Sequence, residues 1–151
     1  MLTIREYSHD SDWKKICHIH DISRLVELKG SASINAFIPL KDCYQDEELF
    51  QSSIYVGEVD QKIIGFVAYN KNEITWLYIK KSQFRKGYGK QLLSFVLKKL
   101  DEPAKVTVLN NNIRAINLYQ SFGFQIVEEK KGKIPNTDVE AIGYKMKQNN
   151  P

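Results

Sequence analysis

The sequence has few cysteines and no long apolar run, and both absences narrow the classes of protein that it can belong to. Its two cysteines, Cys17 and Cys43, form neither a C-x-x-C pair nor a histidine cluster at metal spacing, so we expect buried thiols and no metal. No apolar stretch reaches the roughly 18 residues that a membrane span needs. The start of the chain lacks the pattern of a secretory signal. We therefore expect a soluble, cytoplasmic protein without a membrane partner.

Acidic residues are missing between Glu73 and Asp101, and this interval holds seven of the 22 basic residues. The remaining 15 basic residues are outnumbered by the 18 acidic ones, so the net charge of +4 originates in this segment. A protein that grips a long duplex spreads its cations over many phosphates. The concentration of charge at one place favours a small polyanionic ligand and argues against a nucleic acid partner.

The length and the hydrophobic periodicity predict one mixed domain over residues 1–151. A helix is expected after Ser11, with His20 as a core residue on its apolar face. The stretch from Glu27 to Phe50 lacks a clear period, so we expect a mobile loop and a short helix over 42–50. Further helices are expected over 89–100 and after Asn112. Strands are predicted over 2–7, 53–59, 62–70, 73–80, 104–110, 124–130 and 139–147. This order predicts an α/β fold of the mixed α+β type.

Two glycines, Gly87 and Gly89, stand among cations directly before a helix, in the stretch SQFRKGYGKQLL. Backbone N–H groups that converge at a helix N-terminus bind phosphate, and the helix dipole adds to the attraction. The Walker pattern G-x-x-x-x-G-K-[ST] and the dinucleotide pattern G-x-G-x-x-G do not fit this stretch. The loop therefore indicates a phosphorylated ligand other than ATP or NAD.

A second segment, NNNIRAINLYQSFGF, supplies Asn112, Ala115, Tyr119 and a Phe-Gly-Phe run after one intervening strand. Together the two segments resemble the GNAT superfamily of N-acetyltransferases. That family has an acyl-CoA loop of the form Q/R-x-x-G-x-G/A, followed by a helix, a strand and N-x-x-A-x-x-x-Y…GF. Phe84 stands where the family usually has Gln or Arg, and Arg85 where a small residue is common. Because backbone N–H groups hold most of the pyrophosphate, we expect this departure to tune affinity.

The resemblance implies a mostly antiparallel central sheet flanked by helices, with acetyl-CoA as co-substrate. Tyr119 is implied as the general acid for the departing thiolate. Glu73, at the start of the strand before the loop, is the expected general base, acting directly or through water. Glu58 on the neighbouring strand is the alternative. The implied cofactor-binding residues are Leu77, Tyr78, Ile79, Arg85, Lys86, Gly87, Tyr88, Gly89, Lys90, Asn112 and Tyr119.

The leading functional hypothesis is acetyl transfer to a primary amine of a small molecule or peptide, by direct attack in a ternary complex. A non-catalytic acyl-CoA-binding regulatory module is the alternative, because Phe84 departs from the family pattern and neither Glu73 nor Glu58 is a clear base. An RNA-modifying acetyltransferase has slight support from the basic segment, but coenzyme A already accounts for those cations. The acceptor amine is not identified by the sequence, and either a monomer or a homodimer is compatible with it.

Overall fold

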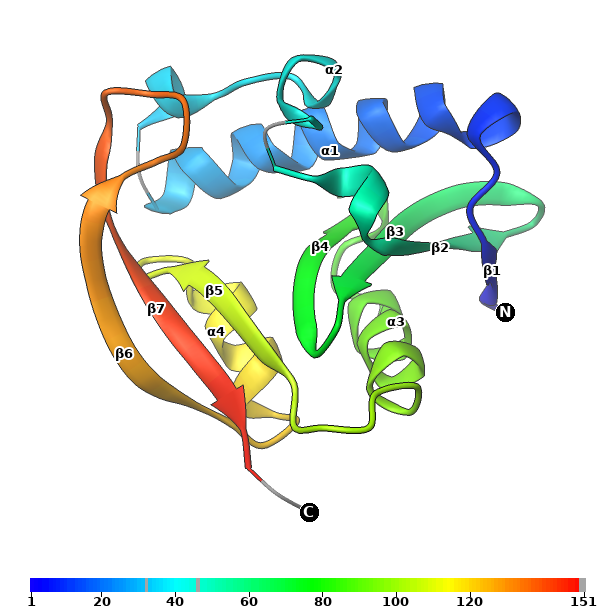
Figure 1. The fold of residues 1–151 in the computed structure, drawn as a ribbon. Helices are drawn as coiled ribbons and strands as arrows, with labels where there is room; N and C mark the ends of the chain where they lie inside the picture. The colour runs from blue at the N-terminus through cyan, green and yellow to red at the C-terminus, as the bar shows by residue number, and fades with distance from the viewer. Residues whose placement is uncertain (32, 46, 150–151) are drawn as a thin grey trace.

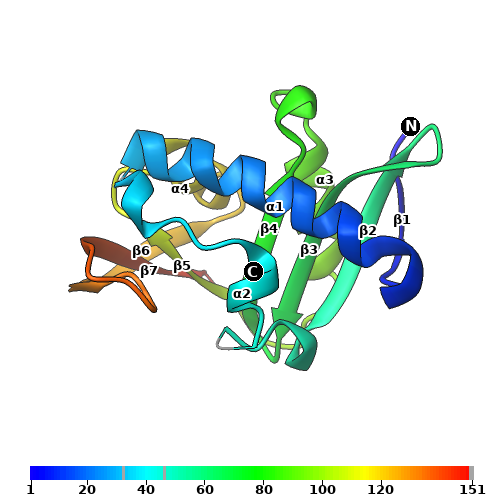
Figure 2. The same ribbon diagram turned by 90° about the horizontal axis from the view of Figure 1, so that it is seen from above.

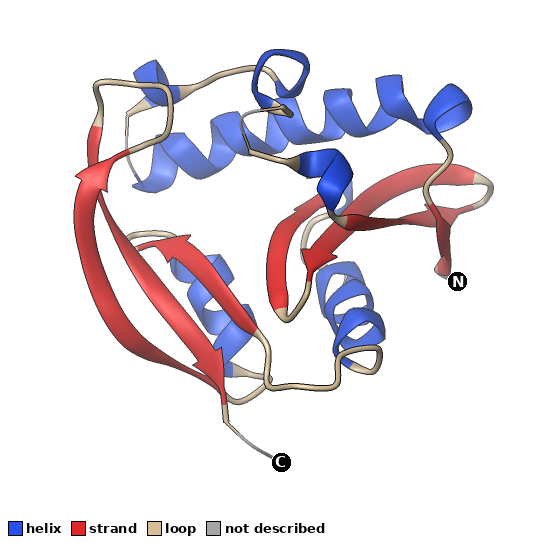
Figure 3. Ribbon diagram, viewed as in Figure 1, coloured by secondary structure: helices blue, strands red, loops and turns tan. Residues whose placement is uncertain are grey.

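A computed structural model describes residues 1–31, 33–45 and 47–149, which form one seven-stranded sheet with helices on both faces (Figures 1 and 3). The strands are β1 Thr3–Glu6, β2 Ser53–Val59, β3 Lys62–Asn70, β4 Glu73–Ile79, β5 Lys105–Leu109, β6 Phe124–Lys133 and β7 Glu140–Gln148. The α-helices are α1 His9–Ser31, α2 Leu40–Cys43, α3 Tyr88–Leu97 and α4 Ile113–Gln120. Short 3₁₀ turns are η1 Ile34–Ala36, η2 Leu49–Gln51 and η3 Lys81–Gln83.

The strands follow the order β1-β2-β3-β4-β5-β7-β6, and every neighbouring pair except β4–β5 is antiparallel. The sequence prediction of a mixed, mostly antiparallel sheet is therefore confirmed. β4 and β5 are parallel neighbours that pair through Glu73 and Lys105 alone. Beyond this contact the two strands diverge, so that the sheet opens between a β1–β4 half and a β5–β7–β6 half (Figure 1).

Two separate apolar clusters fix the helices to opposite faces of the sheet (Figures 1 and 2). Ile16 and Ile19 of α1 pack with Phe66 and Trp76 on one face. Leu92 and Leu93 of α3 belong to the other cluster, which also holds residues of α4, β5 and β7. Alternating side chains along the central strands supply both clusters, as expected for a sheet that is covered on both faces.

Among the helices of the described residues, none has the length and apolar character that crossing a membrane requires.

The hairpin β2–β3 has the predicted strand bounds, and the structure explains its tight turn. Asp60 and Gln61 have φ angles of 52° and 64°. Positive φ at both central residues is the geometry of a type I′ turn, whose twist matches the flanking strands. Asn, Asp and Gly favour this conformation, so Asp60 fits it well while Gln61 carries some strain.

Helix α1 corrects two of the sequence predictions. It begins at His9 rather than after Ser11, because the Asp12 carboxylate accepts the backbone N–H of Ser8 at 2.8 Å. It also runs through Gly30 to its end, where a mobile loop was expected. One glycine near a helix end costs only about 1 kcal/mol, and the fully buried Leu28 offsets this cost. The short helix expected over 42–50 is instead α2 and the 3₁₀ turn η2.

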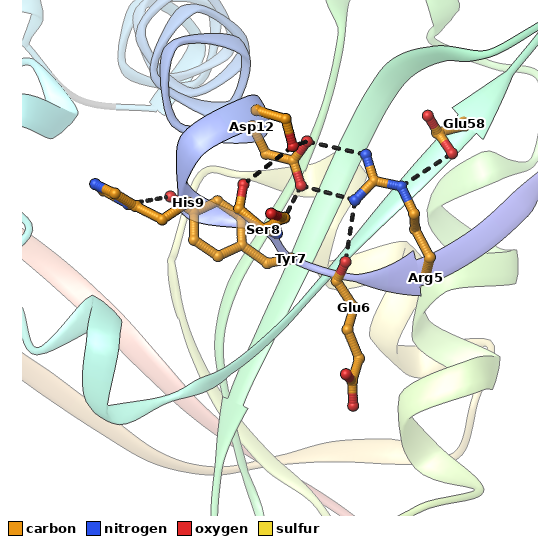
Figure 4. Close-up of polar contacts among 8 residues, drawn as sticks. Arg5, Glu6, Tyr7, Ser8, His9, Asp12 and Glu58 are labelled. Atoms are coloured by element: carbon orange, nitrogen blue, oxygen red, sulfur yellow. Dashed lines mark hydrogen bonds and ion pairs between the residues drawn. The ribbon is translucent and has the colours of Figure 1, made fainter.

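A buried carboxylate joins β1, α1 and β2 (Figure 4). The side chain of Asp12 is 1% exposed and accepts two hydrogen bonds from the Arg5 guanidinium, at 2.8 and 2.9 Å. The same guanidinium donates through Nε to Glu58 Oε1 at 3.1 Å. Arg5 lowers the pKa of Asp12 below its ordinary value. Because the folded state holds this carboxylate ionised, the pair stabilises the fold above about pH 4 and loses its effect as the pH falls further.

We predict that Asp12→Asn lowers the free energy of unfolding by about 2 kcal/mol at pH 7, less than for a fully buried pair because Arg5 is partly exposed. Urea unfolding of both proteins measures this difference, which should shrink as the pH falls below about 4, because Asp12 is then protonated in the unfolded state and, at still lower pH, in the folded state as well. Asp10→Asn, an exposed carboxylate of the same helical turn, is the matched control and should cost about 0.5 kcal/mol. Equal effects of the two substitutions at every pH would contradict the assignment.

Candidate active site

The gap between β4 and β5 exposes backbone groups at the carboxyl end of β4. All residues of the two strands are described, and of these only Glu73 and Lys105 pair across the gap. The last residues of β4 pair with β3 on their other side, where Ile79 faces Gly65 and Tyr78 faces Phe66. Their remaining backbone groups face away from β3. The Ile79 carbonyl oxygen already accepts the Ser23 hydroxyl at 2.6 Å, and the other groups can hydrogen bond an inserted chain.

A cavity of about 560 Å³ opens between the end of β4, the loop before α3, the carboxyl half of α1 and helix α4. Of the cofactor-binding residues that the resemblance implied, Lys86 does not line this cavity and instead donates to Gln83 Oε1 at 3.2 Å. The structure brings the others together around it: Leu77, Tyr78, Ile79, Arg85, Gly87, Tyr88, Gly89, Lys90, Asn112 and Tyr119.

The loop before α3 turns through two left-handed residues, Arg85 with φ 67° and Gly87 with φ 82°. Gly87 is also the N-cap of α3, so no side chain caps this helix. The first backbone N–H groups of α3 therefore have no partner within the helix, and the residues that carry them, Tyr88, Gly89 and Lys90, line the cavity. With the positive end of the helix dipole they form a site for an anion.

The Phe84 ring in this loop lies under a cation from another element. The Arg114 guanidinium of α4 sits with Cζ 3.7 Å from the centre of the ring. Both residues line the cavity. Burial lowers the pKa of Arg114; the opposite charge of Glu27 acts against this, and the like charge of Arg85 lowers the pKa by a smaller amount. Arg114 is a candidate binding residue that the motif comparison did not include.

A second cavity of about 540 Å³ lies between α1, the segment 36–47, strands β4 and β5, and the β6–β7 turn. It contains charged groups of both signs, among them Arg24 and Glu47. Five residues line both cavities: Glu27, Leu77, Tyr78, Ala115 and Tyr119. The two cavities therefore meet at the gap in the sheet, where one molecule can reach another from the opposite side.

Tyr119 of α4 lies at this junction and is 4% exposed, with its ring edge-on to Phe124 at 5.2 Å between centres. Burial raises the pKa of its phenol, and the negative charge of Glu27 raises it further. The phenol therefore keeps its proton throughout the neutral range and can act only as a proton or hydrogen-bond donor there.

Glu27 of α1 is a carboxylate at the junction that the sequence analysis placed in a loop. Its Oε2 accepts a hydrogen bond from Asn112 Nδ2 at 2.8 Å, and its Oε1 accepts one from the Tyr78 hydroxyl at 3.4 Å. Arg24, one helical turn earlier, forms an ion pair with it. Asn112 also caps α4 by accepting the N–H of Ala115 at 3.3 Å. Glu27 thus connects α1 to the start of α4 across the gap.

The two carboxylates expected as general base lie outside both cavities. Glu73 begins β4, about 20 Å along the strand from its carboxyl end at a rise of about 3.3 Å per residue. Glu58 of β2 is held by Arg5 of the edge strand β1 (Figure 4). His20 lines the second cavity, where burial lowers its pKa and its Nδ1 lies 2.9 Å from Asp21.

Metal chemistry has no evident site in the described part of the chain. No group of three or more His, Cys, Asp or Glu residues there could hold an ion. Both cysteines are free thiols; burial raises the pKa of Cys17 to about 11 and raises that of Cys43 further. The polar side chains that line both cavities are the phenols of Tyr78 and Tyr119 and the carboxylate of Glu27.

The sequence match to a known family covers the elements that build the gap and the loop. Residues 50–126 match the family model of the acetyltransferase (GNAT) domain, just over half of the chain. The chain belongs to the GNAT family. The matched range includes β4, the loop, α3, β5 and α4 but not α1, so Glu27 lies outside the region that the family model describes.

Relatives and a solved structure agree with this membership. Spermine/spermidine N(1)-acetyltransferase of Bacillus subtilis (strain 168) is 36% identical over 80 residues, 42% of this chain and 53% of the relative. Peptidyl-lysine N-acetyltransferase YiaC of Escherichia coli (strain K12) is 30% identical over 92 residues, 58% of this chain and 62% of the relative. The chain thus spans between 53% and 62% of the length of these two curated relatives.

The PaiA N-acetyltransferase of Thermoplasma acidophilum, solved in complex with coenzyme A, has the same fold with a TM-score of 0.75. The two chains are 19% identical, and the alignment covers 99% of each. The GNAT fold that the sequence motifs implied is thereby confirmed over nearly the whole chain.

We predict that Tyr119 stays protonated at pH values where an exposed tyrosine, with a pKa of about 10, is half ionised. A raised pKa means that the proton is retained as the pH rises, so Tyr119 should contribute no tyrosinate absorbance below about pH 11. The difference in ultraviolet titration between wild type and Tyr119→Phe isolates this residue. If the variant showed one tyrosinate fewer than wild type near pH 10, Tyr119 would ionise like an exposed tyrosine. That result would contradict its burial beside Glu27.

Proposed function

We propose that this chain transfers the acetyl group of acetyl-CoA to a primary amine of a small molecule or peptide, by direct attack in a ternary complex. The observation that carries this proposal is the meeting of two cavities at the gap between β4 and β5, with Tyr119 and Glu27 lining both. A donor and an acceptor that enter from opposite cavities meet there, so no covalent enzyme intermediate is needed.

The cavity beside the α3 loop has the chemistry that coenzyme A requires. The uncapped N-terminus of α3 suits its pyrophosphate, and Arg85 and Lys90 add positive charge. The open edge of β4 at Leu77 to Ile79 suits the amide groups of the pantetheine arm. Membership of the GNAT family and the coenzyme A named for the PaiA structure support this choice of donor.

The acceptor is proposed from the second cavity and from the names of the relatives. Spermine, spermidine and peptidyl-lysine, which those names contain, share a primary aliphatic amine. The second cavity holds Glu27 and Glu47 beside Arg24, so an ammonium group finds carboxylates near the junction. A primary amine is thus the acceptor class that both observations support.

The transfer requires two proton movements, and two residues at the junction suit them. The amine nitrogen attacks the thioester carbonyl carbon, the C–S bond breaks, and the nitrogen loses a proton. We assign this proton to Glu27, directly or through water, because Glu73 and Glu58 line neither cavity. The departing thiolate takes the proton of the Tyr119 hydroxyl, and a backbone N–H of β4 can stabilise the carbonyl oxygen.

A calorimetric titration tests the donor first, with acetyl-CoA run beside ATP and NAD. We expect binding of acetyl-CoA in the micromolar range or tighter and none of the other two. Release of free coenzyme A with a panel of primary amines then tests turnover. Binding without turnover on any amine would favour the non-catalytic alternative, and absence of acetyl-CoA binding would refute the proposal.

We predict that Glu27→Gln lowers kcat by about 10² to 10⁴, the usual contribution of a general base. Binding of acetyl-CoA should change by less than about fivefold, because the α3 loop is untouched. Without the carboxylate, the rate depends on free amine alone, so kcat/KM should rise tenfold per pH unit up to the pKa of the amine. Steady-state kinetics between pH 6 and 10 measure both effects.

The matched control for this prediction is Glu73→Gln, which removes the carboxylate that sequence order favoured. It should leave kcat within about twofold of wild type, because Glu73 lies at the opposite end of β4. A large loss with Glu73→Gln and none with Glu27→Gln would reverse the assignment and restore the original expectation.

A further inference from the structure

The cations around the phosphate end of the first cavity include one that does not belong to the loop. Arg85 and Lys90 come from the α3 loop and the first turn of α3, but Arg114 comes from the first turn of α4. All three line the cavity. The Phe84 ring under Arg114 fixes where this third charge lies relative to the other two.

The position of Arg114 costs electrostatic free energy in the free protein. A cation in the first turn of a helix faces the positive end of the helix dipole. Arg85 adds a second like charge nearby, and partial burial removes solvation, as the lowered pKa of Arg114 indicates. Stacking on Phe84 is a favourable contact, and the charge of Glu27 acts in the same direction. Glu27 acts on Arg114 more strongly than Arg85 does, so the positive potential at this cavity wall comes from Arg85, Lys90 and Arg114 together, and it suits an anion.

We propose that Arg114 binds a phosphate group of coenzyme A and that the Phe84 ring holds its guanidinium in position. The inference rests on the proposed function, because it assigns a residue to the same donor site. A planar guanidinium can stack on an aromatic ring and still present N–H groups at its edge to phosphate oxygens. Phe84 therefore contributes to the loop by positioning the Arg114 guanidinium of α4, and not by a polar side chain of its own.

Calorimetric titration of coenzyme A into wild type and four variants tests the proposal. Arg114→Ala should weaken binding about tenfold or more, the usual effect of losing a charge-assisted hydrogen bond. Phe84→Leu should weaken it about threefold, because the cation loses its platform. Phe84→Tyr keeps a ring and should bind as wild type does. Lys98→Ala, at the far end of α3 outside the cavity, removes the same net charge and should have no effect.

Shortened ligands identify which phosphate Arg114 contacts. Dephospho-coenzyme A lacks the 3′-phosphate. If Arg114→Ala weakens binding of coenzyme A but not of dephospho-coenzyme A, Arg114 contacts the 3′-phosphate. If it weakens binding of both ligands, Arg114 contacts the pyrophosphate. Pantetheine carries no phosphate and should bind Arg114→Ala and wild type equally. In the double variant, Phe84→Leu should add no loss to that of Arg114→Ala, since the ring acts through the guanidinium.

Two results would overturn the inference in distinguishable ways. If wild type binds coenzyme A and Arg114→Ala behaves like Lys98→Ala, the role of Arg114 is wrong while the proposed function stands. If wild type binds no coenzyme A at all, the proposed function fails and the inference fails with it. If Phe84→Leu weakened coenzyme A binding equally in wild type and in Arg114→Ala, the ring would not act through the guanidinium, and the coupling between them would be rejected.

Discussion

The single paired position between β4 and β5 is the constraint on which the site depends. Parallel neighbours normally hydrogen bond along their whole length, but in these two fully described strands only Glu73 and Lys105 pair. Each strand is fixed on its other side, β4 by β3 and β5 by β7, so the gap keeps its shape without a partner inside it. Gly65 of β3 helps, because a Cβ there would lie 2.8 Å from the carbonyl oxygen of Tyr78. The open edge is thus a product of the whole sheet.

The charges around the gap differ between the two cavities. Cations and helix N–H groups collect at the α3 loop, whereas the carboxylate of Glu27 lies at the junction. Arg24 and Asn112 hold this carboxylate in place, and its charge helps to keep Tyr119 protonated. A phosphorylated donor and a cationic acceptor are attracted from opposite directions by this arrangement. The same element, α1, supplies the carboxylate and covers the gap from one face of the sheet (Figure 2).

Local patterns predicted most of the fold and the donor side of the site. The β2–β3 hairpin was predicted with its observed bounds, because two runs rich in strand-forming residues and a short polar turn lie next to each other in sequence. The loop residues and Asn112 were found because they stand in compact motifs. These features depend on contacts between near neighbours, which a sequence displays directly.

The junction of the two cavities was not predictable in the same way, because α1, β4 and α4, which are far apart in sequence, meet there only in the folded chain. Glu27 lies on a helix face that lines cavities, so polar residues such as Arg24 interrupt the apolar period there and Gly30 added a loop signal. Glu73 was favoured by its order along the chain, yet strand order does not say which end of β4 meets the ligand. The contact between Phe84 and Arg114 joins residues 30 positions apart and has no local signature.

A crystal structure of the protein with coenzyme A tests the central claim most directly. The account predicts that the pantetheine arm lies in the gap along β4, with the pyrophosphate at the first N–H groups of α3 and the sulfur beside the Tyr119 hydroxyl. Coenzyme A bound outside the gap, or with its sulfur turned away from the junction of the two cavities, would contradict it.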